Sequence, residues 1–395
     1  MAPIFPFTED DLADECAEID AWKARLDQRV TLPRRWVGQL RRDLETEKIA
    51  ASTIMEQVQV TVEEVRRILA GAPTPNVSDE DRSLVLGYRQ AMGFVLRQAD
   101  GEALTWERSL VTNLHDRVMG GSFALGAGRI REGQVFIVNA DGREVFRPPT
   151  SKQVPALLDR VLRRMSTLRC HPALRSAWLH VAVAAVHPFS DGNGRTCRVL
   201  ASAAMYREGF RLPEFTSLEE WWGRHLTTYY SAFECLSSQF DAAADVTPFL
   251  GVHVNAQLSQ VRALDLRQRA EGEIWIAIDN LVGELGLPER LTTALWEVFF
   301  DREVTAGYYR LVADVSAASA TTDLARATAA GLLGATGERR TRRYGPGPRL
   351  YPEVLGQLGI EQLSGTTGTA RLEIVRALTD RLATRHPEKG RAPGP

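Results

Sequence analysis

The sequence predicts a mainly α-helical protein with one short β-hairpin and a separate C-terminal unit. Most of the chain has apolar residues at helical spacing, as in "LPRRWVGQLRRDLETEKIA". The stretch "GQVFIVNADGREVFRPP" instead has two short β-prone runs on either side of Asp141 and Gly142, a pair that favours a hairpin turn. From about residue 275, three helical segments precede a basic stretch, "LLGATGERRTRRYGPGP", which indicates a second unit.

The helices before the hairpin have recognisable start and stop signals. Residues 10–70 have helical spacing, and within them Thr61 and Glu64 predict a capping box. Gly71 ends that helix. The next helix begins at Ser78, with acidic residues in the first turn where the helix dipole favours them, and "TWERSLVTNLHDRVMGG" predicts another.

Further helices are expected after the hairpin, in "TSKQVPALLDRVLRRMSTL", "PALRSAWLHVAVAAV", "RTCRVLASAAMYREGF" and "LEEWWGRHLTTYYSAFECLSSQF". Apolar residues cover every side of residues 177–186, so we expect that helix to be central and buried. The tail after residue 378 is charged and rich in proline and glycine, which predicts fraying.

Composition and charge exclude several classes of protein. The 395 residues are 44% hydrophobic, enough for more than one core. Forty-eight basic residues nearly balance 50 acidic ones, so only a local patch could select a charged partner. The cysteines are scattered and form no CxxC pair, which indicates buried thiols in a reducing compartment rather than zinc or disulfides: Cys16, Cys170, Cys197 and Cys235.

No targeting or membrane segment is apparent. The N-terminus "MAPIFPFTEDDLADE" lacks the basic and apolar regions of a signal peptide. The longest apolar run, "AWLHVAVAAV", is too short to span a bilayer and contains His180. We therefore expect a soluble, cytoplasmic protein with no membrane partner.

The stretch "AAVHPFSDGNGRTCRVL", residues 184–200, concentrates polar chemistry after the buried helix. Pro188 ends that helix and leaves His187 at its end. Gly192, Asn193 and Gly194 then lead into the next helix. Free N–H groups and the dipole at a helix N-terminus favour an anion, and glycine allows close approach.

Two arginines in the first turn of that helix strengthen the prediction of an anion site. Arg195 and Arg198 are three residues apart and project to one side, which opposes the dipole unless an anion lies between them. A polyphosphate fits, because arginine makes bidentate phosphate contacts. Asp191 could hold Mg²⁺ together with phosphate oxygens, and His187 could accept a proton from an attacking hydroxyl.

Each feature alone has an ordinary explanation: a structural histidine, a glycine turn or a solvated arginine. Their occurrence together within a dozen positions favours a site. The chain has no GxxxxGK[ST] motif at this stretch, so the site is not a P-loop.

The residues "HPFSDGNGRTCR" resemble the HPFx(D/E)GNGRxxR signature of the Fic (Fic/DOC, or Fido) family, and the resemblance covers about residues 50–255. It implies a Fic-type helical bundle with a β-hairpin flap over the active site. Most members transfer AMP from ATP to a hydroxyl on a target protein.

The resemblance also implies roles for individual residues. His187 would be the general base on a target Tyr, Ser or Thr hydroxyl, Phe189 would anchor the loop, and Asp191 would hold Mg²⁺. The hairpin near 129–146 would hold the target by strand pairing. The ATP-binding residues would be Gly192, Asn193, Gly194, Arg195, Thr196 and Arg198, with Tyr229 either near the adenine beside Tyr230 or in the core.

The family also has an inhibitory helix with the pattern [ST]xxxE[GN], which "STIMEQ" at 52–57 resembles through Ser52 and Glu56. Glu56 would pair with Arg198 and stop the γ-phosphate from binding. Gln57 departs from the pattern, which has Gly or Asn there.

The C-terminal unit resembles the winged-helix domains that often follow Fic domains. Its helix, turn and second helix order predicts a recognition helix from near Ser316 that carries Ser319, Thr321, Thr322 and Arg326. The wing would carry a phosphate-binding patch of Arg339, Arg340, Arg342 and Arg343. The alternative to DNA binding is a protein-contact or dimer module.

These interpretations divide the chain into an N-terminal helical region (1–105, with the inhibitory helix at about 48–70), a catalytic core (106–255), a linker helix (256–274), a winged-helix-like domain (275–355) and a tail (356–395). They predict an Mg²⁺-dependent protein adenylyltransferase autoinhibited by Glu56, with self-modification and a homodimer as further expectations. The alternatives are AMP removal with a water positioned by Glu56, transfer of another phosphate-containing group, and a DNA-binding regulator that senses nucleotide.

Overall fold

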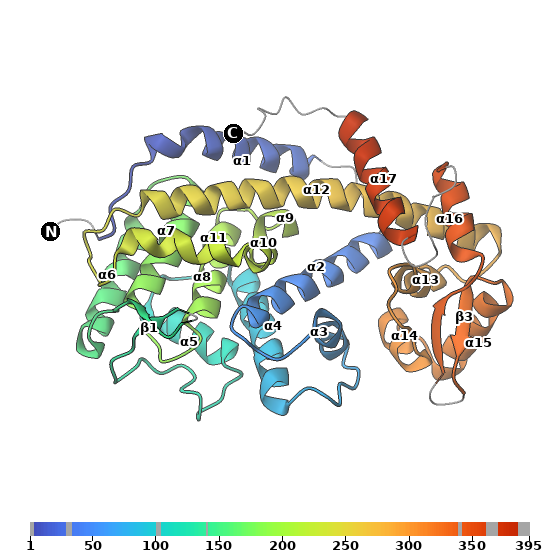
Figure 1. The fold of residues 1–395 in the computed structure, drawn as a ribbon, viewed down its shortest axis with the longest axis horizontal. Helices are drawn as coiled ribbons and strands as arrows, with labels where there is room; N and C mark the ends of the chain where they lie inside the picture. The colour runs from blue at the N-terminus through green and yellow to red at the C-terminus, as the bar shows by residue number, and fades with distance from the viewer. Residues whose placement is uncertain are drawn as a thin grey trace. The chain divides into compact units, whose positions relative to one another are not determined.

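The computed structural model describes residues 4–28, 34–99, 104–139, 141–338, 342–360 and 370–385. The mainly α-helical fold is confirmed (Figure 1). The chain divides into two compact units. The first unit comprises residues 1–31, 41–69 and 73–261, and the second comprises residues 32–40, 70–72 and 262–395.

The first unit begins with η1 (Asp10–Leu12), α1 (Ala13–Asp27), α2 (Arg34–Ile54), α3 (Val62–Leu69), α4 (Asp79–Ala99) and α5 (Arg108–Val118). The predicted capping box is present, because the Glu64 N–H donates to the Thr61 hydroxyl (3.2 Å) and the Thr61 N–H donates to the Glu64 carboxylate (2.9 Å). Residues 48–70 are therefore not one inhibitory helix, since α2 ends before this cap and a turn joins it to α3.

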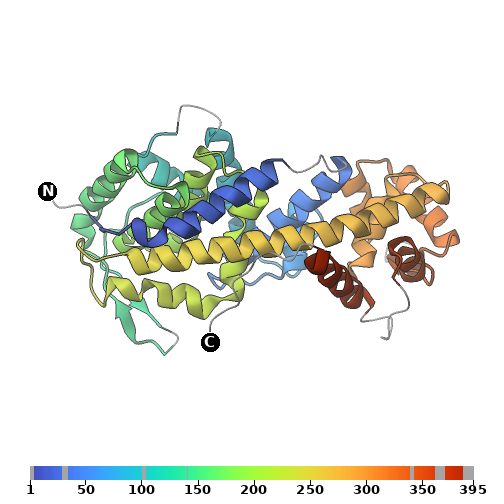
Figure 2. The same ribbon diagram turned by 90° about the horizontal axis from the view of Figure 1, so that it is seen from above.

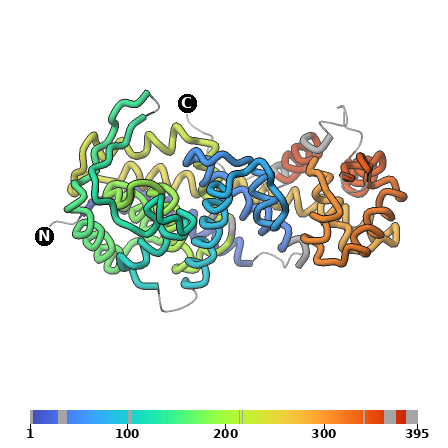
Figure 3. The backbone as a smooth tube through the Cα atoms, turned by 90° about the horizontal axis from the view of Figure 1, so that it is seen from below, coloured from blue at the N-terminus to red at the C-terminus, as the bar shows by residue number. Residues whose placement is uncertain are grey.

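The predicted hairpin consists of β1 (Ile137–Val138) and β2 (Glu144–Phe146), which pair antiparallel and protrude from their unit (Figures 2 and 3). Its turn is wider than a two-residue Asp141-Gly142 turn. The side-chain oxygen of Asn139 accepts hydrogen bonds from the N–H groups of Asp141 (3.1 Å) and Arg143 (2.9 Å), as in an Asx turn.

The core of the first unit is built around two adjacent helices, α7 (Pro172–Val186) and α8 (Asn193–Arg207), with η2 (Ser151–Gln153) and α6 (Val154–Thr167) before them. Nearly every side chain of α7 is buried, as its uninterrupted apolar sequence predicts. α4 and α5 pack against α8, and α6 packs against α7. The loop between α7 and α8 thereby connects two buried helices.

The segment after α8 contains α9 (Pro213–Thr216), α10 (Leu218–Arg224), α11 (Leu226–Ser231), η3 (Ala232–Leu236) and α12 (Thr247–Glu284). The prediction of one helix from "LEEWW" to "SSQF" is wrong, because the backbone leaves helical geometry at His225 (φ −127°, ψ 48°). His225 Nδ1 lies 2.8 Å from the Trp221 carbonyl, which terminates α10. The predicted linker helix 256–274 lies within the 38 residues of α12.

The second unit contains α13 (Leu291–Phe299), α14 (Ala306–Ala313), α15 (Ala317–Ala329), β3 (Leu333–Thr336), β4 (Arg343–Pro346), α16 (Leu350–Leu358) and α17 (Ala370–Arg385). β3 and β4 pair antiparallel. The assignment of this unit as a winged helix stays a prediction.

The prediction of a frayed tail after residue 378 is wrong up to Arg385, because these residues belong to α17. Ile374, Leu378 and Leu382, four residues apart, are buried along one side of this helix. In the described parts of the chain, no helix combines the length and apolar character that crossing a membrane requires.

Candidate active site

The loop between α7 and α8 begins with a histidine in an unusual backbone conformation. His187 has φ 50° and ψ 63°, the left-handed region, and its N–H donates to the Val183 carbonyl at 2.9 Å, which ends α7. Its Nδ1 lies 3.3 Å from the Ala184 carbonyl. A proton on Nδ1 satisfies that carbonyl and leaves Nε2 as a hydrogen-bond acceptor.

The electrostatic environment keeps His187 neutral. Burial lowers the pKa of the imidazole to about 4, and the nearby Arg131 guanidinium acts in the same direction. Near neutral pH the side chain is therefore available to accept a proton at Nε2.

A buried histidine that the sequence analysis missed fixes the other end of this loop. His115 of α5 has Nε2 2.9 Å from the Asp191 carbonyl, and its Nδ1 accepts a hydrogen bond from the Gly128 N–H at 3.0 Å. Its ring stacks on Phe189 with centroids 3.6 Å apart. Burial lowers the pKa of His115 to about 4, consistent with a neutral ring that donates through Nε2. In the sequence, His115 is marked only as a histidine among the apolar residues of a helix, which does not indicate that it contacts the loop.

Arg131, which the sequence analysis also missed, holds the loop to the segment that leads into the hairpin. Its guanidinium donates to the carbonyls of His187 (2.8 Å), Gly133 (2.9 Å) and Pro149 (2.6 Å). Its own N–H donates to the Pro188 carbonyl at 3.0 Å. Because these partners are backbone atoms, no pattern of side chains in the sequence marks them.

The start of α8 is organised by local hydrogen bonds. Gly192 (φ 71°) precedes the helix, and a Cβ there would lie 2.4 Å from Met119 Sδ, so glycine is required. The Thr196 hydroxyl donates to the Gly192 carbonyl at 2.8 Å. The Asn193 amide makes two hydrogen bonds with the Phe189 backbone, at 3.0 and 2.9 Å, so this side chain holds the loop.

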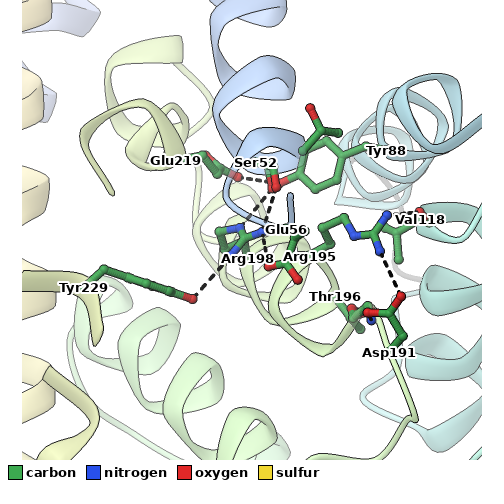
Figure 4. A network of polar contacts seen from close by, with 12 residues as sticks. Ser52, Glu56, Tyr88, Val118, Asp191, Arg195, Thr196, Arg198, Glu219 and Tyr229 are labelled. Atoms are coloured by element: carbon green, nitrogen blue, oxygen red, sulfur yellow. Dashed lines mark hydrogen bonds and ion pairs between the residues drawn. The ribbon is translucent and has the colours of Figure 1, made fainter. Parts of the chain in front are cut away.

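Arg195 is buried beneath the first turn of α8. Its Nη1 donates to the Val118 carbonyl at 3.2 Å, and its Nη2 lies 3.8 Å from the Asp191 carboxylate (Figure 4). Its buried Nε has no hydrogen-bond partner in the part of the chain that the structure describes. The Asp191 carboxylate itself is 64% exposed.

Arg198 is held by groups that are far from it in the sequence (Figure 4). Its Nε donates to the Ser52 hydroxyl at 2.9 Å, and its Nη2 donates to the Ser52 carbonyl at 3.0 Å and to Glu56 Oε1 at 2.8 Å. Its Nη1 lies 3.4 Å from the Tyr229 hydroxyl. The structure thus brings together Ser52, Glu56 and Arg198, which the sequence analysis had associated.

Gly194 lies directly under the Glu56 carboxylate. A Cβ at this position would lie 2.3 Å from Glu56 Oε1 and 3.1 Å from Arg198 Nη1. The absent side chain therefore makes room for the carboxylate, at the place where free N–H groups of a helix favour negative charge.

Tyr229 lies in the core of the first unit. Its ring contacts Trp222 and Phe233, at centroid distances of 5.1 and 5.4 Å, and its hydroxyl lies 3.2 Å from His180 Nε2. The neighbouring Tyr230 is 58% exposed.

A sequence model of the Fic/DOC family matches residues 105–205, which include α5, the hairpin, α7 and the loop to α8. This segment is a Fic domain.

Among curated relatives, the matched part of the chain is 34% identical over 154 residues to protein adenylyltransferase fic-1 of Caenorhabditis elegans, covering 37% of this chain and 29% of that protein. It is 32% identical over 136 residues to protein adenylyltransferase Fic of Nematostella vectensis, covering 34% and 31%. The matches thus span less than a third of either relative.

Solved structures extend the likeness of the fold beyond the Fic domain. A Fic family protein from Desulfovibrio desulfuricans G20 aligns with a TM-score of 0.55 at 20% identity, covering 88% of this chain and 99% of that chain. Fic-1 from C. elegans aligns with a TM-score of 0.52 at 22% identity, covering 64% and 71%.

Gln57 stands where the inhibitory pattern has Gly or Asn, and its backbone conformation is one that these two residues adopt readily. Gln57 follows Glu56 in the turn after α2 and has φ 62°. Glycine and asparagine adopt this left-handed conformation most readily, whereas other side chains adopt it at a cost. The chain therefore makes the turn with a less favourable residue.

Asp191 is the residue expected to hold Mg²⁺, and it lies just before the start of α8. Asp191 Oδ1 accepts the Gly192 N–H at 2.6 Å, and its side chain remains largely exposed. Within the described ranges, no group of three or more His, Cys, Asp or Glu side chains could hold an ion. A single exposed carboxylate fits an Mg²⁺ ion that phosphate oxygens also bind.

The predicted recognition helix and wing belong to the second unit. The Ser316 hydroxyl caps α15 by accepting from the Ser319 N–H at 3.1 Å, and Thr321 and Thr322 are exposed. Arg326 donates to the Gly286 carbonyl at 2.8 Å. In the wing, Arg343 pairs with Glu303 and Arg342 is exposed, while Arg339 and Arg340 lie outside the described residues.

Proposed function

We propose that this protein is an Mg²⁺-dependent protein adenylyltransferase that moves AMP from ATP to a Tyr, Ser or Thr hydroxyl of a target protein. Two curated relatives of its Fic domain are named protein adenylyltransferases. One observation carries the proposal. His187 is neutral, its Nε2 can accept a proton, and its loop leads directly into the start of α8, where two arginines lie.

In this reaction the target hydroxyl oxygen attacks the α-phosphorus of ATP. The bond from that phosphorus to the bridging oxygen breaks, and pyrophosphate leaves in line with the incoming oxygen. His187 Nε2 takes the hydroxyl proton, which its low pKa and its Nδ1–H contact to the Ala184 carbonyl allow.

The start of α8 provides the phosphate site. Gly194 leaves the backbone open to close approach, and the N–H groups of this first turn point toward the anion. Arg195 adds a buried positive charge beneath this turn, and its Nε has no hydrogen-bond partner among the described residues. Thr196 and Asn193 support this turn through their hydrogen bonds to the loop.

Asp191 would hold Mg²⁺ together with phosphate oxygens, because its carboxylate is exposed beside the same turn. When bound, the ion would neutralise part of the phosphate charge. The short contact from Asp191 Oδ1 to the Gly192 N–H orients the carboxylate at the loop.

We further propose that Glu56 inhibits the reaction. Its carboxylate takes the Nη2 donor of Arg198 that a γ-phosphate would need, and it overlies Gly194 at the phosphate site. Ser52 binds the same guanidinium and holds it toward the inhibitory turn. The Glu56 carboxylate and the triphosphate of ATP would therefore compete for the Arg198 guanidinium and the start of α8.

Incubation of the full chain with ATP and Mg²⁺, followed by intact-protein mass spectrometry, tests the proposal. Because Glu56 is proposed to inhibit the wild-type chain, the same incubation is made with Glu56→Gly. A gain of AMP on that protein or on an added target supports the proposal, whereas a gain of phosphate, or no change in Glu56→Gly, rejects it. His187→Ala should abolish the gain while ATP binding, measured by calorimetry, survives. Glu234→Ala, at an exposed position on the same unit, is the control.

The partners and location of the whole protein belong to the same proposal. DNA binding by the second unit would depend on its basic wing, and a gel shift with the full chain at low and moderate salt tests it. Analytical ultracentrifugation tests the homodimer. A cytoplasmic location stays a prediction, to be checked by fractionation of the host cell.

A further inference from the structure

A small cavity lined by both polar and apolar side chains lies next to Arg198, inside the first unit. It is about 20 Å³ in volume, and its lining includes His180 of α7, Glu219 of α10 and His253 and Gln257 of α12. None of these groups takes part in the proposed transfer reaction. The cavity therefore needs an explanation of its own.

Several buried polar atoms around this cavity lack a hydrogen-bond partner among the described residues: His180 Nδ1, His253 Nδ1, His253 Nε2 and Glu219 Oε2. The three side chains are no more than 2% exposed. Glu219 Oε2 has only a long ion-pair contact to Lys48 Nζ at 3.9 Å, while Oε1 accepts from the Tyr88 hydroxyl. Buried polar atoms without partners are rare, because leaving water without a replacement costs free energy.

The size of the cavity restricts what could satisfy these atoms. One water needs roughly 10–15 Å³ of such space and two to four polar partners, whereas a metabolite needs several hundred. The described residues offer no set of three metal-ligating side chains there. We infer that the cavity is a buried water-binding site formed by His180, Glu219 and His253.

The direction of the neighbouring hydrogen bonds supports this site. Arg198 can only donate, so its Nη1 donates to the Tyr229 hydroxyl (3.4 Å), and that hydroxyl in turn donates to His180 Nε2 (3.2 Å). His180 then carries its proton on Nδ1, a buried atom that has no hydrogen-bond partner among the described residues and that a water in the cavity could satisfy. Burial lowers the pKa of His180 well below its usual value, in keeping with a neutral ring. The bound water can pass a hydrogen bond on to Glu219 Oε2, which only accepts.

The water thus completes a chain of hydrogen bonds, called the relay below, that joins Glu219 through His180 and Tyr229 to Arg198. The opposite donors of Arg198 contact Ser52 and Glu56 (Figure 4). His180 and Tyr229 are positioning residues in this arrangement, because they act through Arg198. The water site stands without the proposed function, whereas its effect on nucleotide binding rests on it.

Substitution of His253 tests the water site without any nucleotide. If water fills the cavity, His253→Leu removes one of its partners, and the unfolding midpoint should fall by about 2 °C or more. If the cavity is dry, the same change removes two unsatisfied nitrogens and the midpoint should rise, which overturns the inference. Crystals of the wild-type chain that diffract to high resolution should show ordered water within hydrogen-bond distance of His180 Nδ1, and an empty cavity there also overturns it.

The relay is tested by the tautomer of His180 and by Tyr229→Phe. Long-range ¹H–¹⁵N NMR spectra should show the Nδ1–H tautomer of His180, and an Nε2–H tautomer overturns the relay. In the Glu56→Gly chain, Tyr229→Phe should weaken ATP binding about fivefold, the worth of one hydrogen bond. Tyr309→Phe, which removes a buried hydroxyl in the second unit, should not. Unchanged binding overturns the relay, and failure of the Glu56→Gly chain to bind ATP at all overturns the proposed function instead.

Discussion

The Glu56 carboxylate lies 2.8 Å from Nη2 of Arg198, and the guanidinium is almost completely buried. A buried guanidinium that loses its carboxylate partner destabilises the protein, because the charge is then left uncompensated. Any nucleotide that uses Arg198 must therefore replace the carboxylate.

Removal of that carboxylate should activate the protein. We expect Glu56→Gly to raise self-modification with labelled ATP at least tenfold, because Arg198 is freed for phosphate. Glu56→Gln, which keeps the size and loses the charge, should give a smaller increase.

Glu234→Gly removes an exposed carboxylate elsewhere in the first unit and serves as the control. Equal labelling in wild type and Glu56→Gly would reject the inhibitory role, even if transfer itself is observed.

The backbone of Gln57 suggests how tightly the inhibitory turn is held. At φ 62°, Gln57→Gly should stabilise the turn by about 1 kcal/mol. We expect a higher unfolding midpoint and lower basal labelling, since Glu56 would be held in place more firmly.

Gln28→Gly is a matched control, because Gln28 is an exposed glutamine away from this turn and has φ −89°. A rise in labelling for Gln57→Gly would contradict the idea that the turn limits inhibition.

Arg131 should position His187 through the backbone. Arg131→Lys keeps the charge but loses most of the three carbonyl contacts, so transfer should fall about 10- to 100-fold in the Glu56→Gly chain. ATP affinity should change far less, because no Arg131 contact involves the start of α8.

The measurement is a comparison of transfer rate with ATP binding for the same variant, with Arg129→Lys as the control on an exposed neighbour. Loss of both in equal measure would indicate a general loss of structure.

Acid should destabilise the fold through its buried histidines. The folded pKa values of His115 and His187 are lowered to about 4 and that of His253 to about 3, while the unfolded value is about 6.5. Each histidine contributes its full stability above pH 6.5. The contribution is lost as the pH falls from there toward the folded pKa, because the unfolded chain binds the proton first.

Each of these groups adds a slope of at most about 1.4 kcal/mol per pH unit. Urea unfolding at several pH values checks this prediction. A free energy of unfolding that stays constant between pH 6.5 and 4.5 would contradict it.

Much of the site could be predicted because its chemistry is close together in the sequence. Residues His187 to Arg198 occupy twelve positions, and the structure places their side chains around one helix start. Glu56 is distant in sequence, and it was predicted only from the resemblance of residues 52–57 to the inhibitory pattern of the Fic family. The main helices were also predictable, since α7 is almost entirely apolar and α8 follows directly after the glycine-rich loop.

The rest depended on contacts that leave no pattern in the sequence. Arg131 and His115 act on carbonyls of a loop that only the folded chain brings to them. The break at His225 arises from one side-chain contact to the backbone within an otherwise helical sequence. The apolar spacing of α17 was present, but the charged and Pro/Gly-rich composition of the whole tail concealed it.

The left-handed backbone at His187 has a consequence for engineering. Glycine would occupy φ 50° with less strain than histidine, because it has no Cβ. A screen that rewards heat resistance alone would therefore enrich replacements at this position. The most durable clones from such a screen would be those without the proton acceptor that the proposed chemistry needs.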